Sequence, residues 1–261
     1  MEIPVYQVDA FTTEAFGGNP AAICPLDDWL PDATMQTLAM ENNLSETAFL
    51  VGRGGGEYDL RWFTPGAEVD LCGHATLATA WVLFERLGEE APAITFHTKS
   101  GPLNVSRQGG RLVMDFPALP PKPEPMPDGL VEALGREPVA FLRALKNMAI
   151  FDSEADVRAI TPDFNYIADM EGMGLIITAP GDASDCASRF FAPKVGINED
   201  PVTGSAHCTI VPYWSERLGK TDIYARQVSA RGGDLYCRYQ GDRVEMAGNA
   251  VMTMQGAMML G

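Results

Sequence analysis

The chain has little of what would direct it to nucleic acid or to a membrane. Basic residues are few, 19 against 35 acidic ones, so the net charge is −16. Such a surface repels phosphate backbones, which argues against nucleic-acid binding. The first five residues lack the basic start and apolar core of a signal peptide. The longest late apolar stretch, 251–260, is interrupted by Gln255 and falls far short of the roughly 20 residues that span a bilayer. We therefore expect a cytoplasmic protein with no membrane and no nucleic-acid partner.

Cysteine and histidine are also scarce. The five cysteines include no C-x-x-C pair, and an odd number of this kind is typical of reduced, cytosolic thiols. Only three histidines occur, and none stands at ligand spacing to a pair of cysteines, so no metal site is expected. The strand–Gly-x-Gly–helix pattern of nucleotide-binding folds is absent as well. We expect no cofactor.

What the chain does have is an internal repeat. Gly73-His74-Ala75-Thr76 and Gly204-Ser205-Ala206-His207 lie 131 positions apart, half of the 261 residues, and each opens an apolar, helix-like run. Phe63-Thr64-Pro65 precedes the first and Phe191-Ala192-Pro193 precedes the second. The spacing predicts two copies of one unit whose helix starts face each other across a cleft. Exposed N–H groups at a pair of helix starts would hold a small carboxylate. The same small residues also suit a helix packed closely on a strand, and spacing alone leaves both interpretations open.

The coarse pattern predicts an α+β protein. Each half reads as several strands around one long helix, at about 74–87 and at 205–218, with Pro212 expected to kink the second helix. The segment 118–127 is rich in proline and reads as an extended linker. The predicted units are therefore 1–117 and 128–249, and the last strand, about 250–261, could return to the first unit.

Two carboxylates and two residues at the helix starts are the candidate reactive groups. Glu46 begins an apolar strand, where partial burial would suit it for proton transfer, although the segment by itself favours an edge-strand glutamate that faces water. Asp200 precedes the second helix, a place where aspartate is often only a turn or cap residue. His74 and Ser205 lie at the helix starts. Each of the four is more often structural when taken singly, but together they suit moving a proton on a small carboxylic acid.

Four sequence blocks, in order along the chain, resemble one protein family. They are Val8-Asp9-Ala10-Phe11-Thr12 with Phe16-Gly17-Gly18-Asn19-Pro20-Ala21-Ala22, then Asn43-Leu44-Ser45-Glu46-Thr47-Ala48-Phe49, Leu71-Cys72-Gly73-His74-Ala75-Thr76, and Asn198-Glu199-Asp200-Pro201-Val202-Thr203-Gly204-Ser205-Ala206-His207. With these blocks the chain resembles the PhzF-type phenazine-biosynthesis isomerases. The resemblance implies the diaminopimelate-epimerase-like fold, in which two pseudo-symmetric units each wrap a curved, mostly antiparallel sheet around a central helix. It also implies an active site in the cleft between the units.

The resemblance further implies a set of roles. The glutamate of the S-E-T block is the family's proton-shuttling acid/base, which carries over to Glu46. The family's site is lined by the histidine of the G-H block and by the aspartate and serine of the D-P-V-T-G-S block, here His74, Asp200 and Ser205. The expected catalytic residues are Glu46, Asp200 and His74, and the expected substrate-binding residues are Gly73, Gly204 and Ser205. The family's type reaction converts trans-2,3-dihydro-3-hydroxyanthranilate to its ketone tautomer without a cofactor, and members commonly form homodimers.

Cys72 leaves an alternative open. It stands directly before Gly73 at a helix start, where amino-acid racemases of this fold keep the first of two catalytic thiols. A helix start favours the thiolate. The matching block of the second half has no cysteine before Gly204, and Cys208 lies a turn into the helix, so a second thiol is missing. We therefore interpret Cys72 as a small buried residue.

Three hypotheses follow. The first is a cofactor-free isomerase that transfers a proton on a small carboxylic acid. The second is a Cys72-dependent amino-acid racemase or epimerase, and the third is a non-catalytic relative that binds a metabolite. The sequence does not identify the substrate or the pathway, because a PhzF-like chain need not belong to phenazine biosynthesis.

Overall fold

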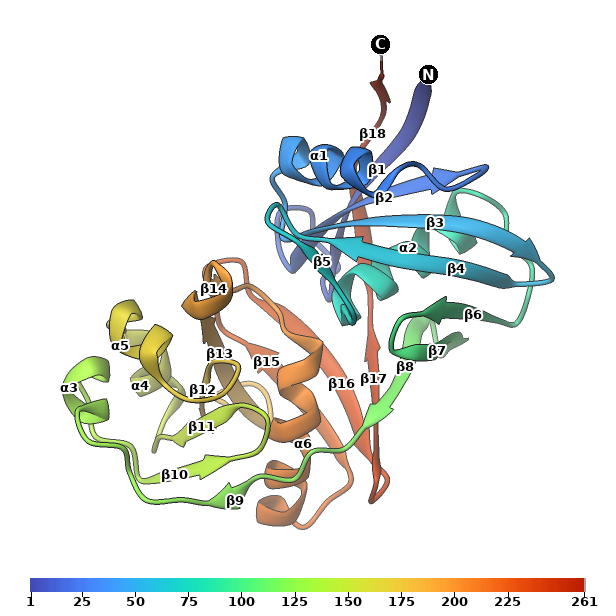
Figure 1. Ribbon diagram of the computed structural model, residues 1–261. Coiled ribbons are helices and arrows are strands. Elements are labelled where there is room, and N and C mark those ends of the chain that lie inside the picture. The colour runs from blue at the N-terminus through green and yellow to red at the C-terminus, as the bar shows by residue number, and fades with distance from the viewer. Residues whose placement is uncertain (261) are drawn as a thin grey trace. The chain divides into compact units, whose positions relative to one another are not determined.

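The computed structural model describes residues 1–260, which fold as two compact units. The first comprises Met1–Asp115 and the C-terminal segment from Ala247, and the second comprises Phe116–Met246. Figure 1 shows why the C-terminal segment belongs to the first unit: the last strand lies beside the first one. The predicted last strand ran to position 261, and that final position lies outside the described residues.

The first unit contains two helices and a sheet of long strands. Its elements are β1 (Glu2–Ala10), β2 (Asn19–Leu26), α1 (Asp32–Asn42), β3 (Glu46–Gly54), β4 (Glu57–Phe63), β5 (Glu68–Val69), α2 (Gly73–Glu85), β6 (Ala93–Thr98), β7 (Gly101–Gln108), β8 (Arg111–Pro117) and β18 (Ala250–Met259). β1 pairs with β18 and with β2, both antiparallel. The β2–β3 pair is parallel, β3–β4 and β4–β5 are antiparallel, β4–β6 is parallel, and β6–β7 and β7–β8 are antiparallel.

The second unit repeats this order. Its elements are β9 (Lys122–Pro123), α3 (Leu130–Leu134), β10 (Ala140–Arg143), β11 (Asn147–Ile150), α4 (Glu154–Ala159), α5 (Phe164–Asp169), β12 (Leu175–Pro180), β13 (Cys186–Ala192), a 3-10 turn (Pro193–Val195), β14 (Ile197–Asp200), α6 (Gly204–Leu218), β15 (Asp222–Gln227), β16 (Gly233–Tyr239) and β17 (Arg243–Gly248). The β10–β11 pair is antiparallel, β11–β12 parallel, β12–β13 and β13–β14 antiparallel, β13–β15 parallel and β15–β16 antiparallel. From β1 through β7 and from β10 through β16, the alternation of parallel and antiparallel pairs is the same.

Each sheet buries apolar side chains on both faces. In the first unit, α1 covers one face over Phe49 and Phe63, and α2 packs on β1, β2 and β3. In the second unit, α3, α4 and α5 cover one face and α6 packs on β15 and β16. A helix between such strands has almost no polar face, and α2 is accordingly buried from His74 to Ala80. The α+β prediction, with each sheet around one helix, is confirmed.

The predicted central helices are close to those observed, since α2 begins at Gly73 and α6 at Gly204. Leu218, the last residue of the predicted helix, is exposed because α6 ends there and Gly219 follows in the left-handed conformation. The proline-rich segment is also more structured than a free linker, because β9 pairs with β10. Within residues 1–260, no helix combines the length and the apolar composition that a membrane span requires.

A glycine contact in the first unit tests this packing. A Cβ added to Gly248 would lie 2.5 Å from Cδ1 of Phe11, which is fully buried. We expect Gly248→Ala to lower the free energy of unfolding by about 1–3 kcal/mol, measured by urea denaturation. Gly256→Ala is the matched control, because nothing lies within 4 Å of its added Cβ. Equal stabilities of the two variants would contradict the described packing around Phe11.

Candidate functional site

The first group of polar residues lies where α2 begins. Cys72 is extended and provides the N-cap position, so the helix starts at Gly73. Glu46 is the first residue of β3, and β3 is hydrogen-bonded to β2 on one side and to β4 on the other. Glu46 is therefore not on an edge strand facing water, as its segment alone suggested; it is 9% exposed.

Glu46 and His74 meet inside the first unit. Oε2 of Glu46 lies 3.1 Å from Nε2 of His74. The two atoms are close enough for an ion pair, but their directions do not meet hydrogen-bond geometry, and within residues 1–260 neither has another hydrogen-bond partner. Buried polar atoms are normally hydrogen-bonded. This pair therefore offers an acceptor and a ring nitrogen to a ligand at one place.

The other ring nitrogen of His74 is held by two neighbours. Nδ2 of Asn19 donates to Nδ1 of His74 at 3.2 Å, and Sγ of Cys72 lies 3.5 Å from the same nitrogen. An Nδ1 atom that accepts from an amide has no proton of its own. The proton of the neutral imidazole is then on Nε2, the nitrogen nearest to Glu46.

The Cys72 thiol is not activated by its place at the helix start. Burial, together with the negative charge of Glu46, raises the pKa of Cys72 to about 11, and the opposing effects of His74 and of the Ala75 amide are smaller. The helix start therefore does not produce a thiolate, because the loss of solvent outweighs its effect. The interpretation of Cys72 as a small buried residue agrees with its 6% exposure.

His74 experiences opposite influences. Burial lowers the pKa of His74, whereas the neighbouring Cys72 and Glu46 side chains raise it, and the net direction is well above its ordinary value. The Glu46 side chain, 3.1 Å away, is thus one of the two neighbours that favour the protonated ring.

The same cluster resembles a set of metal ligands. One ligand atom each from Glu46, Cys72 and His74 lies within 4.8 Å of the others. This cluster could not be predicted from residue spacing, because its carboxylate comes from Glu46 on β3, far from α2 in the sequence. A metal would have to displace the proton of a thiol whose pKa is about 11 and take a nitrogen that already contacts Asn19 or Glu46. The donor set thus fits a proton-transfer site better than a metal site.

The second group of polar residues lies where α6 begins. The hydroxyl of Thr203 donates to Oδ2 of Asp200. Gln227, fully buried on β15, donates from Nε2 to the Asp200 carbonyl at 2.6 Å and accepts the Thr203 N–H on Oε1 at 2.8 Å. Ser229 donates to the carbonyl of Pro201. These bonds fix the loop that carries Asp200 into the helix.

The start of α6 keeps free donors. Thr203 makes no side-chain cap, and the first turn has no acidic residue. Ser205 is half-buried in this turn, and within residues 1–260 no acceptor contacts the N–H of Gly204 or Ser205. Farther into the helix, Nδ1 of His207 donates to the Thr203 carbonyl at 2.8 Å. Burial lowers the pKa of His207 to about 4, so this ring stays neutral and its role is to hold the helix start.

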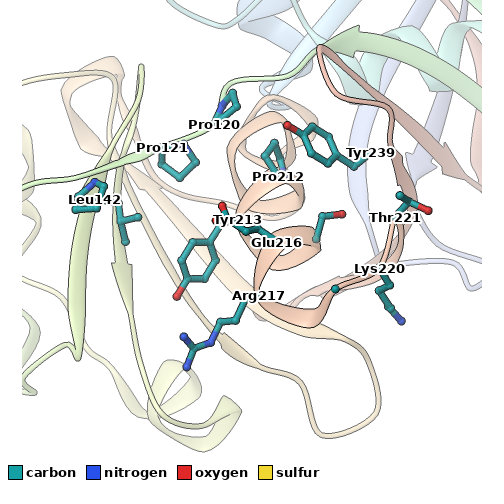
Figure 2. Close-up of a pocket in the computed structure, with 13 residues that line it drawn as sticks. Pro120, Pro121, Leu142, Pro212, Tyr213, Glu216, Arg217, Lys220, Thr221 and Tyr239 are labelled. Atoms are coloured by element: carbon teal, nitrogen blue, oxygen red, sulfur yellow. The ribbon is translucent and has the colours of Figure 1, made fainter.

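Figure 2 shows a groove of about 950 Å³ at the opposite end of α6. Tyr213, Arg217 and Tyr239 line it together with Pro120 and Pro121. None of the predicted site residues is part of its lining. The groove is therefore separate from the polar group at the start of α6.

The structure thus sorts the predicted residues into two groups. Glu46, Gly73 and His74 lie together in the first unit. Asp200, Gly204 and Ser205 lie together in the second. Sequence reasoning did not assign roles to Asn19 or Gln227; Asn19 stood in a quoted block, but nothing in the sequence marked Gln227.

Comparisons with known proteins identify the relatives of this chain. The family model described as PhzC-PhzF, phenazine biosynthesis-like protein, matches residues 8–256. An uncharacterized isomerase of Pseudomonas aeruginosa is 52% identical over 260 residues, with 100% of both chains covered. The crystal structure of a PhzF-family protein of Enterococcus faecalis has a TM-score of 0.97 and 46% identity and covers 100% of both chains. A probable proline racemase of Agrobacterium radiobacter, at 10% identity, 99% and 93% coverage and a TM-score of 0.67, shares the fold.

Alkylation tests the state of Cys72. With a pKa of about 11, only about one thiol in 10⁴ is ionised at pH 7, and burial hinders access. We expect iodoacetamide to modify Cys72 slowly at neutral pH and roughly tenfold faster for each pH unit up to about pH 10, followed by peptide mass spectrometry. Rapid, pH-independent labelling above pH 6 would show an activated thiolate and contradict this assignment.

Proposed function

Because the chain belongs to the PhzC-PhzF family of phenazine biosynthesis-like proteins, we propose that it is a cofactor-independent isomerase that moves a proton on a small carboxylic acid. The observation that carries the proposal is the buried contact of Glu46 with His74. Two polar atoms there lie 3.1 Å apart without hydrogen-bond geometry. Such atoms are expected where a reacting group binds.

In the proposed reaction Glu46 acts as the base and then as the acid. Its carboxylate takes a proton from one carbon of the substrate, and the carboxylic acid so formed returns a proton to another carbon. The electron pair of the broken C–H bond shifts into the conjugated system and forms the new C–H bond, so the net change is a tautomerisation. No oxidant, reductant or proton donor from outside is consumed.

His74 and Asn19 support this transfer in the proposal. Asn19 leaves the imidazole proton on Nε2, where it hydrogen-bonds the substrate or the Glu46 carboxylate. Asn19 is then a positioning residue that acts through His74. Burial of the pair excludes water, which would otherwise compete for the proton.

The second unit supplies binding groups in the proposal. The free N–H groups of Gly204 and Ser205 at the start of α6 suit a carboxylate, as do those of Gly73 and His74 in the first unit. Asp200, fixed by Thr203 and Gln227, hydrogen-bonds a hydroxyl or amine of the substrate. We also include in the proposal a cytoplasmic location and a homodimer, supported by the five free cysteines and by the family resemblance.

The racemase alternative has less support. A two-base racemase needs a thiol or thiolate from each repeat, and Thr203 stands before Gly204 where Cys72 stands before Gly73. The protonated state of Cys72 also disfavours it. A metabolite-binding relative without catalysis would not need Glu46 beside His74, and it would catalyse no exchange with solvent.

The central test replaces the proposed base. Glu46→Gln keeps the size of the side chain but cannot carry a proton, so turnover should fall by about 10²–10⁴ while binding survives. The measurement is incorporation of solvent deuterium into trans-2,3-dihydro-3-hydroxyanthranilate and a panel of small cyclic and amino carboxylic acids. Cys72→Ala is the comparison variant and should retain most of the exchange. Exchange that is lost in Cys72→Ala and kept in Glu46→Gln would favour the racemase.

A double-mutant cycle asks whether the two groups act on the same substrate. Asp200→Asn should lower kcat/KM by itself, and residues that act as one catalytic unit are non-additive. The double variant Glu46→Gln with Asp200→Asn should therefore be less impaired than the product of the two single losses. Strict additivity in steady-state kinetics would separate Asp200 from the proton transfer.

A further inference from the structure

The repeat allows each residue of the first group to be matched with a counterpart in the second unit. Thr47 pairs with Phe63 in the first unit, and Leu175 pairs with Phe191 in the second. One residue earlier, the counterpart of Glu46 is therefore Gly174. A Cβ at Gly174 would lie 2.4 Å from the Phe191 carbonyl oxygen, and its φ of +123° belongs to glycine. The second unit cannot hold an acid at the position that corresponds to Glu46.

The neighbouring strand provides a different charged side chain. Ala21 stands opposite Glu46 in the parallel β2–β3 pair. In the parallel β11–β12 pair Asn147 stands opposite Leu175, and Lys146 and Gly174 are the residues directly before these two. The N–H of Asn147 donates to the Gly174 carbonyl at 3.1 Å, so the two chain segments are still side by side there. Lys146 therefore lies in the turn between β10 and β11, close to the position that corresponds to Glu46.

Lys146 is buried and has no salt bridge. Lys146 as a whole residue is 6% exposed, and its Nζ atom lies 5.6 Å from the centre of the Phe190 ring. Among residues 1–260 no carboxylate lies within salt-bridge distance of this ammonium, and it makes no hydrogen bond. A lysine residue is seldom buried to this extent without a partner for its charge.

The surroundings of Lys146 belong to the start of α6. Phe190, over which the ammonium lies, pairs with Asp200 across β13 and β14. Burial lowers the pKa of Lys146, and the charges of Cys208 and Asp200 act in the opposite direction. Both of these residues flank the first turns of α6. The ammonium is therefore within electrostatic range of the helix start whose N–H groups are free.

We propose that Lys146 binds the carboxylate of the substrate in the second unit, together with the free amides at the start of α6. The inference rests on the proposed function for the existence of an acidic substrate. A carboxylate gains a charge-assisted hydrogen bond from the ammonium in a site with little water.

Binding of two matched small molecules tests the proposal without turnover. The probes are 3-hydroxyanthranilate and 2-aminophenol, which is the same molecule without the carboxylate, and binding is measured by isothermal titration calorimetry. We expect the wild-type protein to prefer 3-hydroxyanthranilate. Lys146→Met should weaken the binding of 3-hydroxyanthranilate by about 10- to 100-fold and leave the affinity for 2-aminophenol nearly unchanged. Lys146→Arg should keep part of the preference for 3-hydroxyanthranilate.

Two controls separate binding from folding. Lys122→Met removes an exposed lysine of the same unit and should change neither affinity. Thermal unfolding of each variant reports whether the second unit still folds, and Lys146→Arg, which keeps the charge, remains informative if Lys146→Met unfolds. Acetylation followed by mass spectrometry should show Lys146, and not Lys122, protected by 3-hydroxyanthranilate.

Several outcomes would overturn the proposal. The first is an equal loss of affinity for both probes in Lys146→Met, which would indicate that the ammonium over Phe190 has a structural role. The second is acetylation of Lys146 that 3-hydroxyanthranilate does not prevent. The third is failure of the wild-type protein to bind 3-hydroxyanthranilate. Because these measurements need no catalysis, a carboxylate preference that depends on Lys146 would survive even if Glu46→Gln left solvent exchange intact. In that case the proposed reaction would fail and the anion subsite would remain.

Discussion

The burial of one whole helix in each unit is the constraint on which the rest of the structure depends. A helix such as α2, buried from His74 to Ala80, can be accommodated only when strands cover most of its circumference. Both units meet this demand with the same succession of parallel and antiparallel strand pairs. The first turn of such a helix stays polar, because the N–H groups there have no partner within the helix. The predicted site residues accordingly lie near the starts of α2 and α6.

This constraint explains why much of the fold could be predicted from the sequence. The repeated Gly-x-Ala runs at 73 and 204 mark close helix-to-strand packing, and both helices begin at these glycines. The Ser153-Glu154-Ala155-Asp156 sequence is typical of a helix cap, and the Ser153 side chain accepts the Asp156 N–H. Local signals of this kind depend on neighbouring residues only. The exposure of Leu218, by contrast, depends on where α6 ends against the rest of the unit.

The site was less accessible to sequence reasoning, because its character depends on contacts between distant residues. Glu46 looked like an edge-strand residue until the parallel pairing with β2 placed it in the interior. The place of Cys72 at a helix start favours a thiolate, but burial beside Glu46 has the larger effect on its pKa and in the opposite direction. Asn19 contacts His74, 55 positions away, and Gln227 holds Asp200 and Thr203, 27 and 24 positions away. No spacing rule reports such contacts.

A duplicated unit has two equivalent places beside its two buried helix starts, and electrostatics disfavours filling both alike. A carboxylate at such a place can accept a proton, whereas an ammonium there can hold an anion. In this chain the first place holds Glu46, whereas the second is closed to a side chain at Gly174 and has Lys146 in the turn before β11. The change of charge needs no change of backbone, since strand order and helix start are the same in both units. A fold with two similar units can thus present two different charged side chains, Glu46 and Lys146, near two similar helix starts.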